Sequence, residues 1–487
     1  MSSRFTGKRL AVVCILALLL TVAIGVETGA TINDTTVTLS ASGASVPSSS
    51  SGFTYIGKCV SYAQNSEREL VFNCSNAKVS LRACAPDIIK VWCEPNGKFS
   101  RKYQSFVVSN DNISPVKPAI ADKGKYYKVT TTMLEIRVNK SPFRLDYYDT
   151  KGNLLCKNNA QKGIGWNSKK EFAVWNDISE NEHFWGLGEK REPFDKKGST
   201  IYQWAVDLGG PDSFTPAYGK GKWYGADPHF ISSMGYSIYF DNTSRTCFDM
   251  GKTDPKTYSF GTFDPAPGGE MLYYFIYGPT PKNIVKRFTD MSGKSFMPPQ
   301  WAFGNMQCHW GYTQADIERV AAAYRQKNIP CDVMFADIEW YQEYCTPTRW
   351  NAKNFPDPKG MIEKLDNQGF KVGLIDDPNI TAASDDYLTA DKNGYFIKRK
   401  DNKTSTVSWP WGDISGIMDF FNPDARKWWG SLHNHLADSG IDAFWTDMNE
   451  PARYQPDWTF YNESGGEKGD IYEMHNIYAQ MHHKTLF

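Results

Sequence analysis

The chain has 487 residues, which is enough for two or three domains of ordinary size. Its 54 Lys and Arg residues equal its 54 Asp and Glu residues, so the formal net charge is zero. This balance argues against a protein that binds nucleic acid or an anionic membrane by charge. Aromatic residues make up 14% of the chain. They fit either an ordinary aromatic core or flat apolar surfaces that bind an uncharged small molecule.

The N-terminus has the pattern of a signal peptide. Three basic residues precede an apolar stretch from Leu10 to Ile24, and the small residues Ala23 and Gly25 suit a cleavage site. We therefore expect residues 1–25 to be removed, which leaves a protein without a membrane anchor that is secreted or held in the lumen of the secretory pathway. An uncleaved signal anchor is the competing interpretation, because the apolar stretch is close to the shortest length that spans a bilayer.

Residues 26–52 are predicted to be a Ser- and Thr-rich linker, because they contain too few large apolar residues to repay the entropy of folding. Export is compatible with eight glycosylation sequons, not all of which can be used. They begin at Asn33, Asn73, Asn112, Asn139, Asn242, Asn379, Asn402 and Asn462.

Four cysteines lie close together in the sequence, at Cys59, Cys74, Cys84 and Cys93. In an oxidising compartment we expect them to form disulfides, although their pairing does not follow from their spacing. No Cys-x-x-Cys pair and no helical His pair of the metalloprotease type occurs, so we expect no zinc site.

Residues 53–297 are predicted to form an antiparallel β-sandwich. Short runs rich in β-branched and aromatic residues alternate there with turns of Gly, Pro and Asn. Examples are Tyr126–Thr130, Leu134–Val138, Tyr236–Phe240 and Met271–Tyr277. One helix is expected from Pro279 to Ser292, near the end of this domain.

After Pro299 the pattern changes to alternating strands and helices, which is typical of βα units and a parallel sheet. The expected strands are Ala302–Met306, Asp332–Asp337, Val372–Ile375 and Ala443–Trp445. The expected helices are Gln314–Gln326, Pro358–Gln368, Pro423–Ser439 and Asp470–His483. Four units are half of a (β/α)₈ barrel, so we expect residues 298–487 to be the N-terminal half of a barrel in a truncated sequence.

The last of these strands leads into the segment Ala443-Phe-Trp-Thr-Asp-Met-Asn-Glu-Pro451. An apolar run that stops at Asp447 predicts a buried strand opening into a loop, and loops at strand ends often carry chemistry. A carboxylate beside an indole can attack an electrophilic carbon while the aromatic face packs against a sugar ring. The alternative is that Asp447 only caps the following segment and that Glu450 is a solvated charge.

This segment resembles the nucleophile motif Trp-x-Asp-Met-Asn-Glu of glycoside hydrolase family 31, the retaining α-glucosidase and α-xylosidase family. Other segments similar to that family follow its order along most of the chain after about Phe172. They are Phe184–Glu189, Pro298–Gly304, Trp310–Tyr312, Ile329–Val333, Asn354–Pro358, Trp409-Pro410, Asn422–Trp429 and His475–Tyr478. Chance agreement at so many places is implausible.

The resemblance implies a domain like galactose mutarotase followed by a TIM barrel. It implies a retaining α-glycosidase that hydrolyses terminal α-linked glucosyl or xylosyl residues of an oligosaccharide or glucan, without a metal or organic cofactor. Asp447 would bond to the anomeric carbon and form a covalent glycosyl ester. Glu450 belongs to the same motif and would orient or tune Asp447 as the second catalytic residue.

The resemblance also assigns substrate-binding roles. Asp337, at the end of the second strand, would accept hydrogen bonds from sugar hydroxyls, although a helix cap explains this residue equally well from its type alone. A loop of the sandwich would present Asp207, with Asp212 as the competing candidate. The remaining pocket residues would be Ile338, Ile380, Trp409, Trp445 and Met448.

Two departures from the family leave the sugar and the linkage open. Glu339-Trp340 stands where the family often has Asp-Tyr, and Trp411 stands where a Gly is usual. The family's acid/base is an Asp on a loop after a later strand, and the sequence ends before it. The alternatives are therefore an α-glucosyltransferase of the same family, or an inactive sugar-binding fragment that lacks the acid/base. We expect no measurable hydrolysis and poor solubility from these residues alone, because an open half barrel exposes apolar surface.

Overall fold

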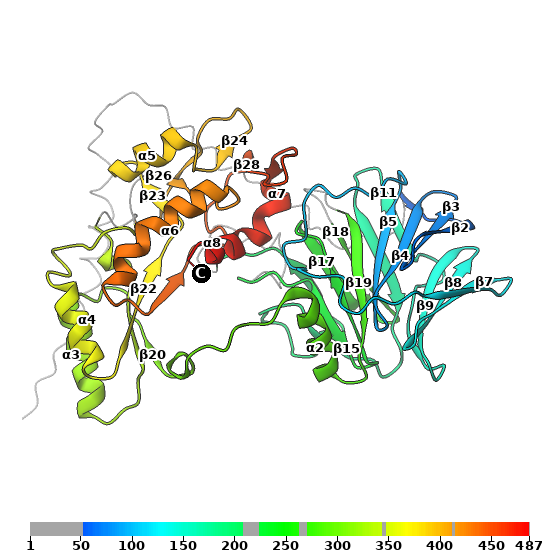
Figure 1. Ribbon diagram of the computed structural model, residues 1–487, viewed down its shortest axis with the longest axis horizontal. Helices are drawn as coiled ribbons and strands as arrows, with labels where there is room; N and C mark the ends of the chain where they lie inside the picture. The colour runs from blue at the N-terminus through cyan, green and yellow to red at the C-terminus, as the bar shows by residue number, and fades with distance from the viewer. Residues whose placement is uncertain (1–51, 208–223, 263–269, 343–346, 412–413, 487) are drawn as a thin grey trace, which may run out of the picture. The chain divides into compact units, whose positions relative to one another are not determined.

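The computed structural model describes residues 52–207, 224–262, 270–342, 347–411 and 414–486 (Figure 1). The predicted signal peptide, nearly all of the predicted linker, the sequon at Asn33 and the competing candidate Asp212 lie outside these ranges. No helix within the described ranges is long and apolar enough to cross a membrane.

The first part of the described chain consists of three antiparallel sheets. The six-stranded sheet has the order β1 (Phe53–Tyr55), β11 (Ile164–Asn167), β12 (Phe172–Asp177), β18 (Thr257–Thr262), β17 (Thr246–Asp254) and β14 (Thr200–Gln203). The five-stranded sheet has the order β10 (Leu154–Lys157), β9 (Phe143–Asp149), β8 (Leu134–Lys140), β7 (Tyr126–Thr130) and β6 (Ala119–Asp122). The eight-stranded sheet has the order β13 (Phe184–Gly186), β15 (His229–Ser232), β16 (Tyr236–Phe240), β19 (Met271–Tyr277), β5 (Ile88–Glu94), β4 (Lys78–Ala85), β3 (Glu69–Cys74) and β2 (Cys59–Ser66).

The three sheets share one hydrophobic core, as a sandwich requires. Along β8 the side chains of Leu134, Ile136 and Val138 are buried while their neighbours are partly exposed, which is the period of two that the sequence predicted. The predicted β-sandwich is confirmed. Helix α2 (Pro281–Ser292) follows β19, and Thr280 caps it by accepting from the backbone of Asn283.

The second part contains a sheet of four parallel strands (Figure 1). Its order is β20 (Met306–Gln307), β21 (Val333–Ala336), β22 (Lys371–Asp376) and β27 (Ala443–Thr446). Helices α3 (Gln314–Gln326), α4 (Pro358–Asp366), α6 (Pro423–Asp438) and α8 (Tyr478–Leu486) alternate with these strands in the sequence. The alternation and the parallel pairing confirm the predicted βα units of a barrel.

The helices begin where the sequence provides caps. Asp357 accepts a hydrogen bond from the amide of Gly360 in the first turn of α4, and Asn422 accepts one from the amide of Asp424 in α6. Pro follows each of these two caps at the first helical position, where its missing N–H costs nothing. These local signals explain why the starts of α4 and α6 agree with the prediction.

Two elements differ from the prediction. The expected strand Ala302–Met306 is instead a 3₁₀ helix, η2 (Gln300–Phe303), followed by the short β20, because the turn that begins after Pro299 closes at Gly304 before any strand can pair. The single helix expected over residues 470–483 is divided into α7 (Ile471–Met474), η4 (His475–Ile477) and α8, because the side chains of His475 and Asn476 in η4 bind the backbone of the sandwich.

Several elements between and after the parallel strands were absent from the prediction. After β22 come four short strands and one helix, and after β27 come two more short strands. They are β23 (Asn379–Thr381), α5 (Asp385–Asn393), β24 (Lys398–Arg399), β25 (Thr406–Ser408), β26 (Ile414–Ile417), β28 (Trp458–Phe460) and β29 (Gly469–Asp470). After β21 the 3₁₀ helix η3 (Ile338–Trp340) follows directly. Strands of two to four residues carry too little periodicity to be recognised from a sequence.

The expectation of disulfides in the sandwich is corrected. Cys59, Cys74, Cys84 and Cys93 are free thiols in the structure. Cys59 on β2 stands opposite Cys74 on β3, whereas Cys93 on β5 stands opposite Val79 of β4. Cysteines that are close in the sequence are therefore not all close in the sheet, because the strands place them in different rows.

Candidate active site

Acidic residues follow three neighbouring parallel strands at the same edge of the sheet. Asp337 comes directly after β21, Asp376 is the last residue of β22 and Asp377 follows it, and Asp447 comes directly after β27. Asp376 is paired in register with Thr446, so Asp377 and Asp447 occupy equivalent positions on adjacent strands. The carboxyl ends of parallel strands are where barrel proteins place their functional groups.

Asp447 is the residue on which the other acids converge. Burial raises the pKa of its carboxyl, and the negative charges of Asp207 and Asp337 raise it further, while the backbone N–H of Met448 opposes the rise. Met448 has a φ of 55°, which is uncommon for a residue with a side chain. The acids predicted from three different segments are therefore brought together.

Glu450 lies deeper in the same loop and is only 8% exposed. Burial, followed by the charges of Asp447 and Asp207, raises the pKa of its carboxyl to about 7. Within the described residues, its Oε2 atom is buried without a hydrogen-bond partner. A carboxyl with this pKa can hold or release a proton near neutral pH.

Asp337 acts as a helix cap and also belongs to the acidic cluster. Its Oδ1 atom accepts a hydrogen bond of 2.8 Å from the backbone of Ile338 at the start of η3, and its Oδ2 accepts one of 3.4 Å from the thiol of Cys308. The two interpretations made from the sequence are therefore compatible. Capping fixes the carboxylate at the end of β21, where its charge reaches Asp447.

The loop that carries Asp207 is fixed by the His475-Asn476 motif. The ring of His475 stacks on Trp204 with centroids 3.7 Å apart, and its Nε2 donates to the carbonyl of Ala205 at 2.6 Å. The backbone N–H of Ala205 donates to Asn476 Oδ1 at 3.0 Å. Two segments that the sequence analysis treated separately therefore form one unit, which explains how a residue of the sandwich reaches Asp447.

The predicted apolar pocket residues differ in exposure and belong to different hydrophobic clusters. Ile380, Trp409 and Met448 belong to one hydrophobic cluster, and Ile338 belongs to another that lies between α3, α4 and the parallel sheet. All four are buried. Trp445 is 40% exposed and packs edge-on against Phe335, with ring centroids 6.4 Å apart. Their contacts with a substrate stay predictions.

Asp377 is a site residue that the sequence analysis missed. It is fully buried; its Oδ2 accepts a hydrogen bond of 3.2 Å from the indole of Trp411, and its Oδ1 has no partner within the described residues. Burial, and then the charge of Asp447, raises its pKa well above the usual range. Its position after the predicted strand Val372–Ile375 was an available signal, because the same argument had selected Asp337 and Asp447.

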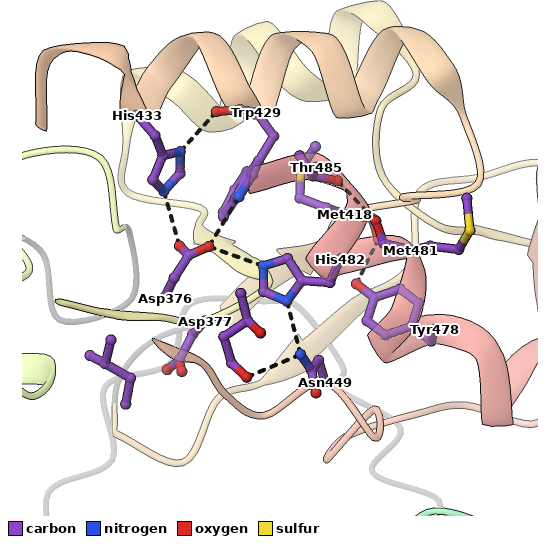
Figure 2. Close-up of polar contacts among 12 residues, drawn as sticks. Asp376, Asp377, Met418, Trp429, His433, Asn449, Tyr478, Met481, His482 and Thr485 are labelled. Carbon is purple, nitrogen blue, oxygen red and sulfur yellow. Dashed lines mark hydrogen bonds and ion pairs between the residues drawn. The ribbon is translucent and has the colours of Figure 1, made fainter. Parts of the chain in front are cut away.

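Asp376, the preceding residue, is also fully buried but has several partners (Figure 2). It accepts hydrogen bonds from His433 Nε2 at 3.1 Å, His482 Nε2 at 3.0 Å and Trp429 Nε1 at 3.3 Å. Burial alone would raise the pKa of Asp376, but the two histidines outweigh it and lower the pKa to about 2. This cluster lies directly behind the loop of Asp447.

No group of three or more His, Cys, Asp or Glu side chains in the part of the chain that the structure describes is arranged to hold a metal ion. That the reaction needs no cofactor stays a prediction. The fold and the site together define a class of protein, namely a β-sandwich joined to parallel βα units with converging carboxyls and indoles at the strand ends.

Two family models match the chain. The model of the glycosyl hydrolases family 31 TIM-barrel domain matches residues 295–487, and the model of the glycosyl hydrolase 31 N-terminal galactose mutarotase-like domain matches residues 78–249. The chain belongs to glycosyl hydrolase family 31, and the predicted resemblance is confirmed.

Curated relatives of the chain carry glycosidase names. Alpha-glucosidase 2 of Bacillus thermoamyloliquefaciens is 30% identical over 428 residues, which are 86% of this chain and 52% of the relative. Alpha-xylosidase XylQ of Lactiplantibacillus pentosus is 29% identical over 343 residues, which are 66% of this chain and 42% of the relative. The chain thus spans about half the length of the curated relatives it matches.

Solved structures show the same fold. The family 31 dextranase of Flavobacterium johnsoniae, complexed with glucose, has a TM-score of 0.81 and 32% identity; the similarity covers 89% of this chain and 52% of the dextranase. The cycloalternan-forming enzyme of Listeria monocytogenes has a TM-score of 0.77 and 23% identity, covering 89% of this chain and 43% of that enzyme. The second similarity supports the fold alone.

Proposed function

We propose that the chain carries the nucleophile half of a retaining α-glycosidase, with Asp447 as the nucleophile. The observation that carries this proposal is the position of Asp337 and Asp447 directly after β21 and β27 of one parallel sheet, where the negative charges of Asp207 and Asp337 also raise the pKa of Asp447. Three acids from three segments of a chain rarely converge without a function, because each makes ionisation of the others more costly.

A reaction that develops positive charge explains this arrangement. In retaining glycoside cleavage the anomeric carbon becomes cationic in the transition state, and a carboxylate bonds to it to form a glycosyl ester. Negative charge that is unfavourable in the free protein then becomes favourable in the transition state. Asp337 and Asp207 would also accept hydrogen bonds from sugar hydroxyls, and Glu450 would tune the charge of Asp447.

The proposed substrate is a terminal α-linked glucosyl or xylosyl residue of an oligosaccharide or glucan. The names of the relatives support this class, since they are an alpha-glucosidase and an alpha-xylosidase. The Flavobacterium dextranase was also solved as a variant complexed with isomaltotriose. The zero net charge of the chain agrees with an uncharged substrate.

Transfer to a sugar acceptor is the second candidate, and one contact favours it. Trp310 is 64% exposed, and its ring lies 6.2 Å from that of Trp411, whose N–H is held by Asp377. Two adjoining indoles beside a glycosyl ester offer a surface on which an acceptor sugar can stack. An acceptor that occupies this surface would compete with water for the ester.

The test uses glycosyl fluorides, because fluoride leaves without protonation and the reaction then needs no acid. We expect the purified chain to release fluoride from α-glucosyl or α-xylosyl fluoride faster than the Asp447→Asn variant does. The first sugar product, observed by NMR, should be the α-anomer. Added maltose should yield longer oligosaccharides if transfer occurs. A β-anomer as first product, or release equal to that of the variant, would contradict the proposal.

We also propose that the protein passes through the secretory pathway. The sequons at Asn242, Asn379 and Asn462 are buried, and the amide nitrogen of each already donates a hydrogen bond. Asn402 is exposed in a turn and is the better acceptor. In a eukaryotic secretory host, peptide mapping after deglycosylation should find glycan at Asn402 and none at Asn242, Asn379 or Asn462. An unmodified Asn402 would argue against this route, whereas glycan at one of the three buried sites would contradict the burial of that site.

A further inference from the structure

We propose that His482 is a positioning residue for the nucleophile loop: in its neutral form it joins the buried carboxylate of Asp376 to Asn449 and thereby holds Asp447 in place. The inference rests on the proposed role of Asp447 as nucleophile. It assigns a role to a histidine of α8 whose ring lies between Asp376 and Asn449 (Figure 2).

The protonation state of His433 follows from its two partners. Its Nδ1 lies 2.8 Å from the carbonyl of Trp429, and its Nε2 lies 3.1 Å from Asp376 Oδ1. Both partners can only accept, so both ring nitrogens carry a proton and His433 is a cation. The raised pKa of His433 agrees with this, since the charge of Asp376 outweighs the cost of burial.

His482 has different partners and therefore a different state. Its Nε2 donates to Asp376 Oδ2 at 3.0 Å, whereas its Nδ1 lies 3.2 Å from the amide nitrogen of Asn449, which can only donate. The same amide nitrogen also donates to the carbonyl of Thr446 at 3.2 Å, which fixes the orientation of the Asn449 side chain. His482 must accept through Nδ1, so it is neutral. Asp376 thus binds one charged and one neutral histidine.

These bonds connect the buried carboxylate to both sides of Asp447. Thr446 precedes Asp447 and Asn449 follows it by two residues, and the Asn449 side chain spans the turn between them. The backbone N–H of Asp447 itself donates to the carbonyl of Asp376 at 3.0 Å. Asp376 therefore holds the loop through its backbone directly and through its side chain by way of His482.

The loop needs this support for two reasons. Asp447 experiences repulsion from Asp207 and Asp337, which favours a loop that moves away from them. Met448, the next residue, holds an unfavourable positive φ. His482 is fully buried and its ring stacks on Phe420 at 4.5 Å, so it offers a rigid anchor against both forces.

Two substitutions of His482 separate its two bonds. The amide of His482→Gln reaches the position of Nε2 and keeps a donor for Asp376, but it offers nothing to Asn449. The amide of His482→Asn occupies the position of Nδ1 and keeps an acceptor for Asn449, but it does not reach Asp376. His433→Gln disturbs the buried cluster without touching Asn449, and His483→Gln changes the exposed neighbour on α8.

The first readout is the rate at which a 5-fluoro α-glucosyl fluoride labels Asp447. We expect His482→Gln to label at least about tenfold more slowly than the wild type, as is common when a supporting hydrogen bond is lost. His482→Asn breaks the bond to Asp376 and should label similarly slowly, whereas His433→Gln and His483→Gln should stay within about threefold. Wild-type labelling by either His482 variant, or equal slowing by His433→Gln, would overturn the inference in favour of a merely structural cluster.

The second readout keeps the inference separate from the proposed function. If the wild type is not labelled at Asp447, the proposed function fails, yet hydrogen exchange of the amide of Asp447 still reports the position of the loop. Exchange should be faster in His482→Gln and unchanged in His433→Gln and His483→Gln. Should His482→Gln not fold, Asn449→Ala serves instead and should show the same faster exchange. Unchanged exchange in the variant that folds overturns the inference.

Discussion

Two adjacent aspartates at the end of β22 experience opposite environments. Both are fully buried, but Asp376 has two histidines and an indole as partners, and its pKa is lowered to about 2. Asp377 has the indole of Trp411 on one oxygen and a buried second oxygen without a described partner, and its pKa is raised far above the usual range. Burial alone therefore does not determine the pKa of an acid, because the hydrogen bonds and charges of its neighbours can lower or raise that pKa.

The difference separates acids that support the fold from acids that are available for chemistry. A buried charge with its own cation and donors stabilises the place where it lies. Ionising an acid whose neighbours are other acids costs free energy, and such groups are concentrated in functional sites. By this criterion Asp376 supports the site, whereas Asp377, Glu450 and Asp447 belong to it.

The largest expected effect comes from Asp447→Asn. We expect the rate of fluoride release from α-glucosyl fluoride to fall by more than about 10⁴-fold, as for the loss of other nucleophiles. The free energy of unfolding at pH 7 should be unchanged or higher, because the substitution removes repulsion from Asp207 and Asp337. Urea unfolding followed by fluorescence measures the second quantity. A marked loss of stability would mean that Asp447 is a structural acid like Asp376.

The next effect compares Asp376 and Asp377 directly. Asp376→Asn leaves the cation of His433 buried without its counter-charge and should lower the free energy of unfolding by about 3–5 kcal/mol. Asp377→Asn keeps an acceptor for Trp411 and removes an unfavourable charge, so stability at pH 7 should be unchanged or higher. Equal losses in both variants, measured by urea unfolding, would refute the contrast.

Glu450 should make stability depend on pH. Its pKa is raised from the model-compound value of 4.5 to about 7, so the folded state binds its proton more tightly than the unfolded chain. The contribution of this proton to the free energy of unfolding is fully present below pH 4.5. It is lost as the pH rises to about 7, and the loss is at most about 3 kcal/mol. Glu450→Gln should reduce this loss, whereas Glu363→Gln on the exposed side of α4 should not. A wild-type slope in Glu450→Gln would contradict the assignment.

The smallest effect concerns the hydrogen bond between the indole of Trp411 and the carboxylate of Asp377. Trp411→Phe keeps an aromatic ring but removes the N–H donor to Asp377, which should cost about 1 kcal/mol of stability. The ratio of transfer to hydrolysis in the presence of maltose should change little, because the ring beside Trp310 remains. A Trp411→Gly variant removes the ring as well and should lower that ratio. The two variants would behave alike if the indole had no role beyond its hydrogen bond.

The sequence predicted those features that depend on local pattern. The caps at Asp357 and Asn422 fixed the starts of α4 and α6, and the strand-end argument brought Asp337 and Asp447 together. It did not predict Asp377, although the same argument applied to it. The pairing of His433 and His482 with Asp376 could not be predicted, because the three residues come from two helices and a strand that are distant in the sequence.

The central claim, that Asp447 is the nucleophile, is tested most directly by trapping. The chain is incubated with a 5-fluoro α-glucosyl fluoride, digested with a protease, and the labelled peptide is sequenced by mass spectrometry. The account predicts a single glycosyl ester on Asp447, absent from the Asp447→Asn variant. A label on Asp337, Asp377 or Glu450, or no label at a concentration that protects the protein against thermal unfolding, would contradict it.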